Sequence, residues 1–482
     1  MNNKFEKFNL DKNIIKALNN LKYEEPSKVQ EEVIPRLLSE KDVIVKSKTG
    51  SGKTASFAVP LVQKVDINNN SVQGLIIAPT RELALQIKEE IQNIGRIKKV
   101  RCSAIFGKQP LKDQIAELKQ RVHIVVATPG RIIDHIGRGT IDLSNIKYFI
   151  IDEADKMLHK GFVDDMESIL SKLPQKSCKG MFSATIDHNI NIVCDKYMKN
   201  PEMIDIKIDD IQVKKQISEY FIKVEKESRY ETLKDIIYSE CPNSTIIFAN
   251  TRDKVDEIYK NMKKDKFLVG AIHGEMSQDK RLFIIKDFKD YKFNILVSSD
   301  ITARGIHIDD VSLVINYEVP RDKENYVHRI GRTGRVDKLG KAITLVSSNE
   351  EKYLTDIKEY TGNEIEEINN IDEKKVNDGK EELNKLQKNI LKNKKDNKKE
   401  SINEEITRIY LNVGKKKKIR VIDIVGALSN IEGIENEDIG VIEVKDVCSY
   451  VDILNYKGSK FLENNKEITI KKKLVKVKKD RS

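Results

Sequence analysis

The sequence lacks any run of about 18 apolar residues, the length that a helix needs to cross a bilayer, and this absence excludes a membrane-spanning protein. Residues 1–6 contain no apolar signal core, so we do not expect secretion. Cysteine is also scarce: its five residues are never spaced as Cys-x-x-Cys. This pattern argues against a disulfide framework and a cysteine-based zinc site, and it predicts a cytoplasmic location.

Hydrophobic residues make up 39% of the 482 positions and charged residues 34%, enough to bury substantial cores beneath a very polar surface. At about 150 residues per domain, this length predicts roughly three domains. The formal net charge is +11, and it is unevenly distributed: residues 373–403 contain 10 basic and 6 acidic residues, and residues 404–482 contain 17 and 13. The positive excess therefore lies mostly in the last quarter of the chain, a mild indication of a polyanionic partner.

Up to about residue 365, short apolar runs alternate with turns and helical patterns. Such runs are typical of buried parallel strands, so we expect two α/β domains, residues 1–208 and 212–365, joined at a polar stretch between them. Examples of such runs are residues 42–46, 75–78, 123–127, 148–151, 245–249, 294–297, 313–315 and 343–346.

Residues 373–400 contain no proline and no aromatic residue, and lysine and asparagine dominate. We expect a charged linker over 366–403 that is flexible or marginally helical. The last segment, 404–482, is expected to form a small α+β domain with helices on one face of a sheet. Its strand patterns lie at 408–413, 439–444, 449–454 and 468–477, and its helical patterns at 421–428 and 458–464.

Residues 48–54, Lys-Thr-Gly-Ser-Gly-Lys-Thr, follow an apolar strand and precede a helical pattern, although Ser47 stands where the strict motif has its first glycine. This context predicts a phosphate loop, in which Lys53 reaches the terminal phosphates and the Thr54 hydroxyl holds Mg²⁺. Asp152 and Glu153 end a second apolar strand. There, one carboxylate can hold the metal and the other can orient or deprotonate the attacking water.

Together with Ser183-Ala184-Thr185 and residues 328–335 (His-Arg-Ile-Gly-Arg-Thr-Gly-Arg), these motifs resemble the DEAD-box RNA helicase family, in the family's order over residues 5–362. Upstream, Phe5, residues 23–27 and Gln30 resemble its adenine-reading Q motif. The resemblance implies two tandem RecA-like domains and an ATP-dependent RNA helicase that uses Mg²⁺ and locally opens short RNA duplexes.

The resemblance also implies roles for individual residues. Tyr23 would stack on adenine, and Gln30 would read its edge. The other implied ATP contacts are Thr49, Gly50, Ser51, Gly52, Lys53, Thr54 and Gly305. Catalysis would involve Lys53, Asp152, Glu153 and two arginine fingers, Arg332 and Arg335, with Mg²⁺ held by Thr54 and Asp152, partly through water. Coupling between the domains would involve Ser183, Thr185 and His328. The implied RNA contacts are Pro79, Thr80, Arg81, Gly107, Thr128, Gly130, Arg131, Arg252, Gln278, Arg281 and Ser299.

Three positions depart from the family pattern. Lys22 stands where the Q motif usually has glycine, which we expect to be harmless. Residues 106–108, Phe-Gly-Lys, contain one glycine where relatives usually have two, so one close backbone approach to RNA is in doubt. His307 replaces an aspartate that contacts the ribose, which predicts weaker or pH-sensitive ATP binding.

Residues 406–479 resemble the RNA-binding domain that ends DbpA-type DEAD-box helicases. The resemblance implies docking on a hairpin of large-subunit ribosomal RNA near the peptidyl-transferase centre, within a pre-ribosomal particle. Tyr410 and Tyr450 are candidates for base stacking, although Tyr450 could instead face the core. The expected RNA-binding basic residues are Lys415, Lys416, Lys417, Lys418, Arg420, Lys476 and Lys478, with residues 471–473 as a further lysine cluster.

Several interpretations of the function stay open. The first is an RNA helicase of large-subunit assembly, and the second assigns the same core to mRNA turnover or cold-shock remodelling. A third, motivated by His307, is an ATP-regulated RNA clamp or chaperone that hydrolyses ATP slowly. A DNA helicase is disfavoured because residues 152–155, Asp-Glu-Ala-Asp, resemble the RNA-acting branch.

Overall fold

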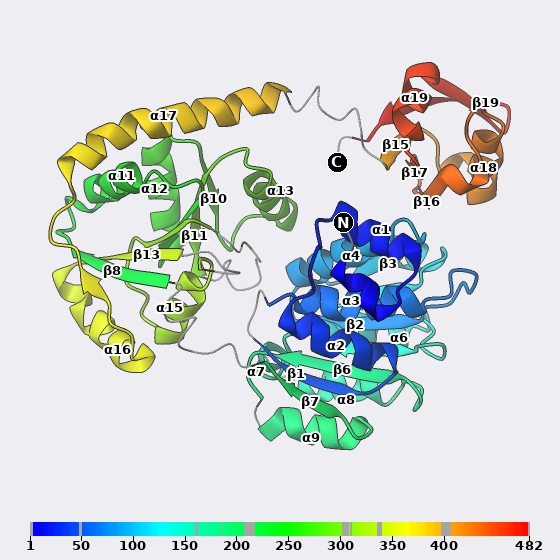
Figure 1. Cartoon of the computed structure of the whole chain (residues 1–482), viewed down its shortest axis with the longest axis horizontal. Helices are drawn as coiled ribbons and strands as arrows, with labels where there is room; N and C mark the ends of the chain where they lie inside the picture. The colour runs from blue at the N-terminus through cyan, green and yellow to red at the C-terminus, as the bar shows by residue number, and fades with distance from the viewer. Residues whose placement is uncertain are drawn as a thin grey trace. The chain divides into compact units, whose positions relative to one another are not determined.

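The structure is a computed structural model, and it describes residues 3–47, 51–159, 162–186, 188–206, 217–300, 308, 311–334, 340–396 and 406–480. The described residues form three folded parts, each presented by itself below (Figure 1). Within these residues, no helix combines the length and the apolar character that crossing a membrane requires.

The first part contains a seven-stranded parallel sheet in the order β3-β4-β2-β5-β6-β1-β7. Its strands are β1 (Val43–Lys46), β2 (Gly74–Ile77), β3 (Cys102–Ile105), β4 (Ile124–Ala127), β5 (Tyr148–Ile151), β6 (Cys178–Ser183) and β7 (Glu202–Asp205). Successive residues of a strand pack on opposite faces of the sheet, each in its own hydrophobic cluster. In β1, Val45 packs in one cluster and Ile44 in the other. Burial on both faces explains why these strands are continuous apolar runs.

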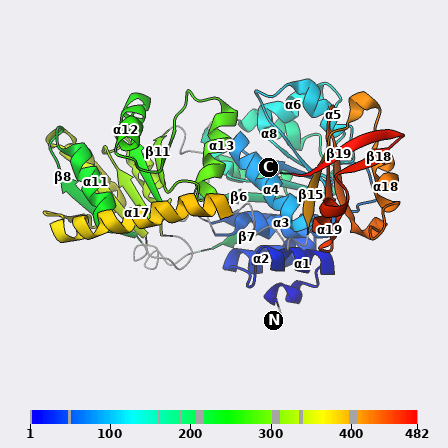
Figure 2. The ribbon, with the colours of Figure 1, turned by 90° about the horizontal axis from the view of Figure 1, so that it is seen from above.

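Helices cover both faces of this sheet (Figure 2). The helices of the first part are η1 (Lys4–Phe8), α1 (Lys12–Asn20), α2 (Lys28–Leu38), α3 (Lys53–Lys64), α4 (Arg81–Gly95), α5 (Leu111–Leu118), α6 (Pro129–Gly137), α7 (Ala154–His159), α8 (Val163–Leu170) and α9 (His188–Tyr197). Side chains of α1 to α4 pack in the first cluster, and side chains of α6 to α9 pack in the second.

The second part repeats this architecture with a parallel sheet in the order β10-β11-β9-β12-β13-β8-β14. Its strands are β8 (Ile217–Lys223), β9 (Thr245–Ala249), β10 (Val269–Ile272), β11 (Ile295–Ser299), β12 (Leu313–Asn316), β13 (Gly340–Val346) and β14 (Glu366–Glu367). Its helices are α11 (Arg229–Glu240), α12 (Arg252–Lys264), α13 (Gln278–Lys289), α15 (Lys323–Ile330), η2 (Ser348–Glu350), α16 (Glu351–Thr361) and α17 (Glu373–Asp396). The prediction of two α/β units is confirmed.

Of the two alternatives expected for the charged linker, flexible or marginally helical, the structure shows a helix, because α17 occupies most of the segment. This 24-residue helix lies against α11 (Figure 2) and belongs to the second compact unit of the chain, which was not expected. Val376 and Leu383 are buried, and Gln387 Nε2 donates a hydrogen bond to Asn294 Oδ1 at 3.4 Å. A narrow apolar stripe therefore anchors an otherwise charged helix.

The third part is a small α+β domain, as predicted, with an antiparallel sheet in the order β16-β17-β15-β19-β18. Its elements are β15 (Thr407–Leu411), η4 (Lys415–Lys417), α18 (Val421–Ser429), η5 (Asn436–Asp438), β16 (Ile439–Val444), β17 (Ser449–Ile453), α19 (Lys457–Asn464), β18 (Glu467–Ile470) and β19 (Lys473–Lys479). The single strand expected over 468–477 is wrong. It is a hairpin whose two turn residues, Lys471 and Lys472, have φ of 49° and 61°.

Candidate nucleotide and RNA sites

The phosphate loop follows β1 and ends where α3 begins. Gly52, the N-cap of α3, has φ +91°, and a Cβ there would lie 2.7 Å from Gln30 Nε2 and 2.8 Å from Ser27 Oγ. Both the backbone conformation and the space therefore require glycine. Ser51 and Thr54 are partly buried beside it, whereas Thr49 and Gly50 lie outside the described residues.

The predicted Q motif contacts this loop directly. Ser27 Oγ donates to the Ser51 carbonyl at 2.9 Å, and Gln30 Nε2 donates to the Gly52 carbonyl at 3.2 Å. Gln30 Oε1 accepts from the Ser27 backbone N–H at 2.9 Å, which closes a capping box at the start of α2. These contacts place the adenine-reading and phosphate-binding candidates in one hydrogen-bonded unit.

Lys53 is buried and points back along the loop, with Nζ donating to the Ser47 carbonyl at 2.9 Å. Ser47, the departure from the strict glycine pattern, is well accommodated. Its backbone N–H donates to the Ser183 carbonyl at 3.0 Å, and its hydroxyl lies 3.1 Å from the Ser51 hydroxyl. The serine thus joins the phosphate loop to β6.

Asp152 and Glu153 directly follow β5, and each side chain is only 3% exposed. Asp152 Oδ1 accepts from the Glu153 N–H at 2.9 Å, and Lys156 Nζ lies 2.7 Å from Glu153 Oε1. Glu153 has φ +53°, which costs about 1–2 kcal/mol for a residue with a Cβ. Strain of this kind gathers at functional sites because the surrounding structure holds it in place.

Asp155 ties these carboxylates to Ser183 and Thr185. Its backbone N–H donates to Ser183 Oγ at 3.1 Å, and its Oδ2 accepts from the Ala184 and Thr185 N–H groups at 3.2 Å each. Because β5, β6 and β1 are neighbouring parallel strands, their carboxyl ends bring the carboxylates, the Ser-Ala-Thr motif and the phosphate loop to one edge.

The predicted RNA contacts of the first domain occupy the other half of the same edge. Residues 79–81 follow β2, Gly107 follows β3 and residues 128–131 follow β4, and these strands are neighbours in the order β3-β4-β2. Thr80 and Thr128 are the N-caps of α4 and α6. Lys108, next to the single glycine, has φ +64°, so the position where two glycines are usual is a left-handed turn.

Gln114, which the sequence analysis did not single out, connects two of these segments. It is 2% exposed. Its Nε2 donates to the Phe106 carbonyl at 2.9 Å, and its Oε1 accepts from Arg131 Nη1 at 2.9 Å. The glutamine therefore fixes Arg131 relative to the Gly107 turn. No sequence signal marks it beyond its place in an amphipathic helix.

The second domain places its candidates on the corresponding edge. Arg252 follows β9, Gln278 begins α13 after β10, and Ser299 ends β11, with β10-β11-β9 as neighbours. Arg281 is one turn along α13, and the structure does not describe the Gln278 side chain. His328 and Arg332 lie at the end of α15, and Arg332 is buried. Arg335, Gly305 and His307 fall outside the described residues.

Arg329, between these residues, was missed as a site residue although it lies in the motif at 328–335. It is 1% exposed. Its guanidinium donates to Asp300 at 2.5 Å and 2.6 Å, to Asn250 Oδ1 at 2.8 Å, to Asn316 Oδ1 at 3.3 Å and to the Glu318 carbonyl at 2.9 Å. Asn250 and Asp300 directly follow β9 and β11, and Asn316 ends β12, so Arg329 joins the carboxyl ends of three neighbouring strands, close in sequence to Arg252 and Ser299.

Comparisons with known proteins agree with this geometry. The chain matches the DEAD/DEAH box helicase family over residues 27–193, the helicase conserved C-terminal domain over 228–337 and the DbpA RNA binding domain over 408–479. The ATP-dependent RNA helicase DbpA of Bacillus subtilis is 44% identical over 98% of this chain and 99% of its own length. This chain belongs to the DEAD-box ATP-dependent RNA helicases, and it is of the DbpA type.

Other DEAD-box relatives match the two α/β domains. The helicase CshA of Geobacillus kaustophilus is 40% identical over 76% of this chain and 78% of its own length. A structure of Saccharomyces cerevisiae Dbp5 bound to RNA and ADP BeF3 is 28% identical, with a TM-score of 0.65, over 81% of this chain and all of that one. As a DEAD-box helicase the chain is an RNA-dependent ATPase, and its α/β domains are the two RecA-like domains of that family.

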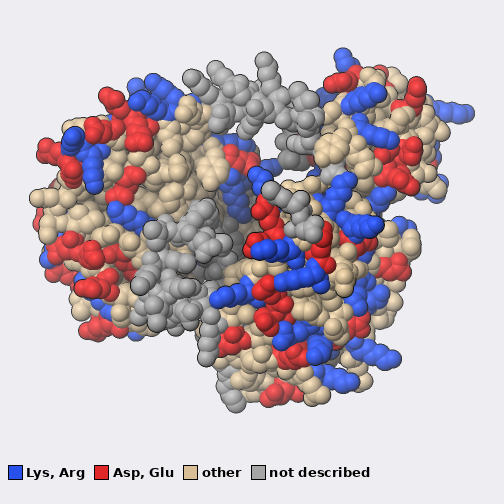
Figure 3. Space-filling view, viewed as in Figure 1, with Lys and Arg blue, Asp and Glu red and all other residues tan. Residues whose placement is uncertain are grey.

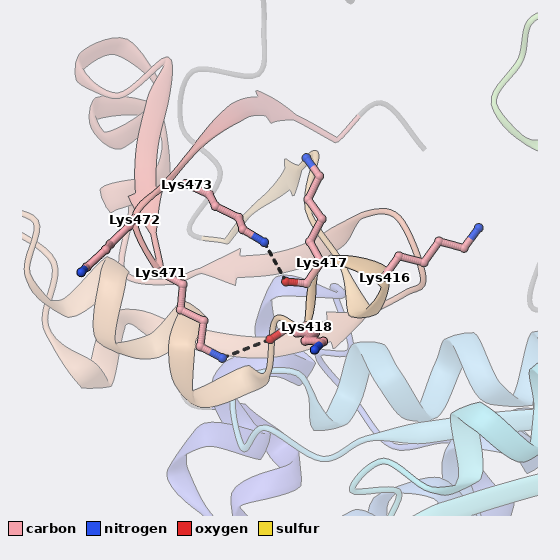
Figure 4. Close-up of a pocket in the computed structure, with 6 residues that line it drawn as sticks. All are labelled: Lys416, Lys417, Lys418, Lys471, Lys472 and Lys473. Atoms are coloured by element: carbon pink, nitrogen blue, oxygen red, sulfur yellow. Dashed lines mark hydrogen bonds between the residues drawn. The ribbon is translucent and has the colours of Figure 1, made fainter.

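The C-terminal domain of this helicase gathers six lysines around one pocket of about 530 Å³ (Figure 4). Lys416, Lys417 and Lys418 line it from one side and residues 471–473 from the other. Lys471 Nζ donates to the Lys418 carbonyl at 3.1 Å, and Lys473 Nζ donates to the Lys417 carbonyl at 3.2 Å. Lys418, Lys471 and Lys472 all have left-handed backbones. Like charges are thus held together by two strained turns, one after η4 and one between β18 and β19.

The remaining basic candidates lie outside this lysine pocket. Arg420 is the N-cap of α18 and its N–H donates to Asp423 Oδ2 at 2.7 Å. Lys476 and Lys478 are exposed on β19, where the alternating Val475 and Val477 are buried. Elsewhere, on the face shown in Figure 3, basic and acidic side chains are interspersed. The pocket is therefore a local concentration of positive charge.

Tyr450 points away from the core of the C-terminal domain, which decides the alternative left open by the sequence. Its strand neighbours Val451 and Ile453 join the core, while Tyr450 meets Tyr410 on the opposite face at 5.7 Å between ring centroids. The same face carries Glu443, which pairs with Arg408 at 2.7 Å. The tyrosine face also carries Arg408 and Lys445 beside the Tyr450 ring, and in the lysine pocket Lys471 Nζ pairs with Asp423 Oδ2 at 2.9 Å. The number of its lysines, six, is what makes the pocket the better-suited surface for phosphate.

Proposed function

We propose that this DEAD-box helicase acts in assembly of the large ribosomal subunit, in the cytoplasm, where its C-terminal domain directs it to a hairpin of ribosomal RNA. The observation that carries the proposal is the lysine pocket within a domain that matches the DbpA RNA binding domain. Support also comes from the relative named DbpA, which is similar over nearly the whole chain, whereas the CshA relative matches about three quarters. In a pre-ribosomal particle, the helicase core would open short neighbouring duplexes.

In the proposed ATP site, Lys53 contacts the terminal phosphates and Asp152 and Thr54 hold Mg²⁺. The donors fit this ion, because Mg²⁺ prefers oxygen ligands and the nearly buried Asp152 carboxylate lies on the same sheet edge as the phosphate loop. Bound Mg²⁺ would neutralise charge that develops on the β- and γ-phosphates. Glu153 orients the attacking water, and its strained backbone and the Lys156 ammonium hold its carboxylate in place.

The two arginine fingers and the RNA contacts complete the proposed cycle. Arg332 and Arg335 stabilise the transferring phosphoryl group when the domains close, an effect worth about 10³–10⁵ in rate in GTPases. Coupling between ATP hydrolysis and closure of the two domains involves Ser183, Thr185 and His328. In each domain the RNA backbone contacts the carboxyl ends of three neighbouring strands, β3-β4-β2 in the first domain and β10-β11-β9 in the second. The hydroxyls, backbone N–H groups and arginines at these strand ends suit sugar and phosphate oxygens. Such contacts clamp and bend one strand, which separates it from its partner.

The experiment measures ATPase stimulation of the full chain by generic single-stranded RNA and by a large-subunit rRNA fragment that contains the peptidyl-transferase hairpin. A variant with Lys416, Lys417 and Lys418 changed to Gln tests the lysine pocket. A matched control changes Lys374, Lys375 and Lys388, which are exposed on α17, and removes the same charge. We expect the fragment to stimulate at about tenfold lower concentration than generic RNA, and the pocket variant alone to lose this preference.

Equal stimulation by both RNAs would contradict the ribosomal role and favour the CshA-like alternative of general RNA remodelling. Tight ATP-dependent RNA binding with negligible hydrolysis would instead favour the RNA clamp. Loss of the preference in both lysine variants would mean that net charge, not the pocket, guides the helicase.

A further inference from the structure

Tyr23 of the first domain is held by a contact that the helicase motifs do not contain. Its hydroxyl donates to Glu90 Oε1 at 2.5 Å. The ring also meets Phe5 edge-on at 6.2 Å, and the Tyr23 carbonyl accepts from Asn3 Nδ2 at 2.7 Å. Phe5 and Asn3 hold the near end of the residue, whereas Glu90 alone among these contacts fixes the far tip of the ring.

The hydroxyl–carboxyl pair is half-buried. Burial raises the pKa of Glu90, and burial together with the Glu90 charge raises the pKa of Tyr23 far above neutrality. The tyrosine therefore keeps its proton and remains the donor. A half-buried carboxyl that lost this donor would lose a hydrogen bond that water replaces only in part, so each partner constrains the other.

Glu90 lies in α4, and this helix begins at the predicted RNA motif. Thr80 caps α4 by accepting from the Leu83 N–H at 3.3 Å, and Arg81 is its first residue. At 1.5 Å per residue, Glu90 lies about 14 Å from Arg81 along the axis. Ile87 and Ile91 are fully buried on the core side of the helix. Since α4 is a continuous, well-anchored helix, a shift of its first turn is transmitted to Glu90.

We propose that Glu90 is a positioning residue for the ATP site: its carboxylate holds the Tyr23 ring in the orientation that stacks on adenine and links that ring to the helix that contacts RNA. This inference rests on the proposed adenine role of Tyr23. Glu90 would thus make ATP affinity respond to RNA bound at residues 79–81, and by linkage RNA affinity would respond to ATP by the same factor.

The test uses the full chain, five single variants and the double variant that combines Tyr23→Phe with Glu90→Leu. Tyr23→Phe keeps the ring and removes the donor, Glu90→Leu removes the acceptor, Glu90→Gln retains an acceptor, and Tyr23→Ala removes the ring. Glu89→Gln, at the exposed neighbouring position of α4, is the control. The KM for ATP and kcat are measured at saturating single-stranded RNA, and the RNA concentration for half-maximal binding is measured with and without a saturating non-hydrolysable ATP analogue.

Loss of one hydrogen bond predicts a rise of about fivefold in the KM for ATP in Tyr23→Phe and Glu90→Leu, with kcat changed less than twofold. The double variant should be no worse than either single one, because both remove the same contact. Glu90→Gln should recover most of the ATP affinity, and the coupling between ATP and RNA should fall in Tyr23→Phe and Glu90→Leu only.

The outcomes separate this inference from the proposed function. If Tyr23→Ala raises the KM for ATP while Tyr23→Phe and Glu90→Leu leave it unchanged, the adenine role stands and the positioning role is overturned. If Tyr23→Ala has no effect on that KM, the adenine assignment falls and the inference with it. A loss of thermal stability in Glu90→Leu with unchanged KM would identify a purely structural contact, and Tyr23→Phe still decides the question if Glu90→Leu does not fold.

Discussion

At the scale of single residues, several side chains sit on left-handed backbone where glycine is usual. Lys22 has φ +61° and Lys108 has φ +64°, each beside a predicted binding motif. A Cβ in this region costs about 1–2 kcal/mol. Lys22 was expected to be harmless, and its effect on activity stays untested. Its backbone conformation nevertheless strains the turn that leads into Tyr23.

Replacing Lys22 by glycine should relieve this strain. Lys22 is exposed, so little packing is lost, and part of the gain is offset by the extra freedom of glycine in the unfolded chain. We expect the first domain to be stabilised by roughly 0.5–1 kcal/mol, measured as a shift of its unfolding transition in urea. Lys22→Ala keeps the Cβ and should bring no gain. Equal gains in both variants would mean that the lysine side chain, rather than φ, destabilises the turn.

At the scale of elements, the strands show what the sequence could predict and what it could not. Runs such as 148–151 were recognised because burial on both faces makes a parallel strand uniformly apolar. β6 (Cys178–Ser183) was not among the runs that were named, because Lys179 and Gly180 interrupt its apolar pattern although every residue is buried. The ordered motifs identified the candidate site residues, but not Gln114, Arg329 or Glu90, whose importance depends on partners far away in sequence.

The packing of α17 on the second domain was not predicted, for a related reason. Its buried residues form one narrow stripe within a lysine-rich sequence, and composition alone cannot tell which surface that stripe covers. The crossing with α11 depends on Gly379, where a Cβ would come within 1.8 Å of the Tyr238 carbonyl oxygen. Backbone atoms cannot yield to a side chain at this distance, so a larger residue must push the two helices apart.

Gly379→Val should therefore release α17 from the second domain. The expected loss is the burial of Val376 and Leu383, about 1.5–3 kcal/mol for each side chain. Hydrogen exchange over 373–396 should become much faster, and the preference for the rRNA fragment should weaken while stimulation by generic RNA is retained. Asn377→Val, at an exposed position of the same helix, is the control. Unchanged hydrogen exchange in Gly379→Val would contradict the prediction, because it would show that α11 and α17 accommodate the larger side chain and stay packed together.

At the scale of the whole molecule, most of the excess of basic over acidic residues lies after residue 372 in the sequence, and the lysine pocket contains part of it. Neutralising phosphates releases counterions, so the logarithm of RNA affinity falls linearly with the logarithm of salt concentration, by about 0.7 per phosphate contact on single strands and 0.9 on duplexes. If Lys416, Lys417 and Lys418 each contact one phosphate, changing all three to Gln should reduce this slope by about 2 to 3. The matched change of three exposed α17 lysines should leave the slope unaltered, although the net charge falls equally. The affinity of each variant for the rRNA hairpin, measured from low to high salt concentration, distinguishes the pocket variant from the α17 control. An equal reduction of slope in both variants would mean that RNA responds to the general field of the chain rather than to the lysine pocket.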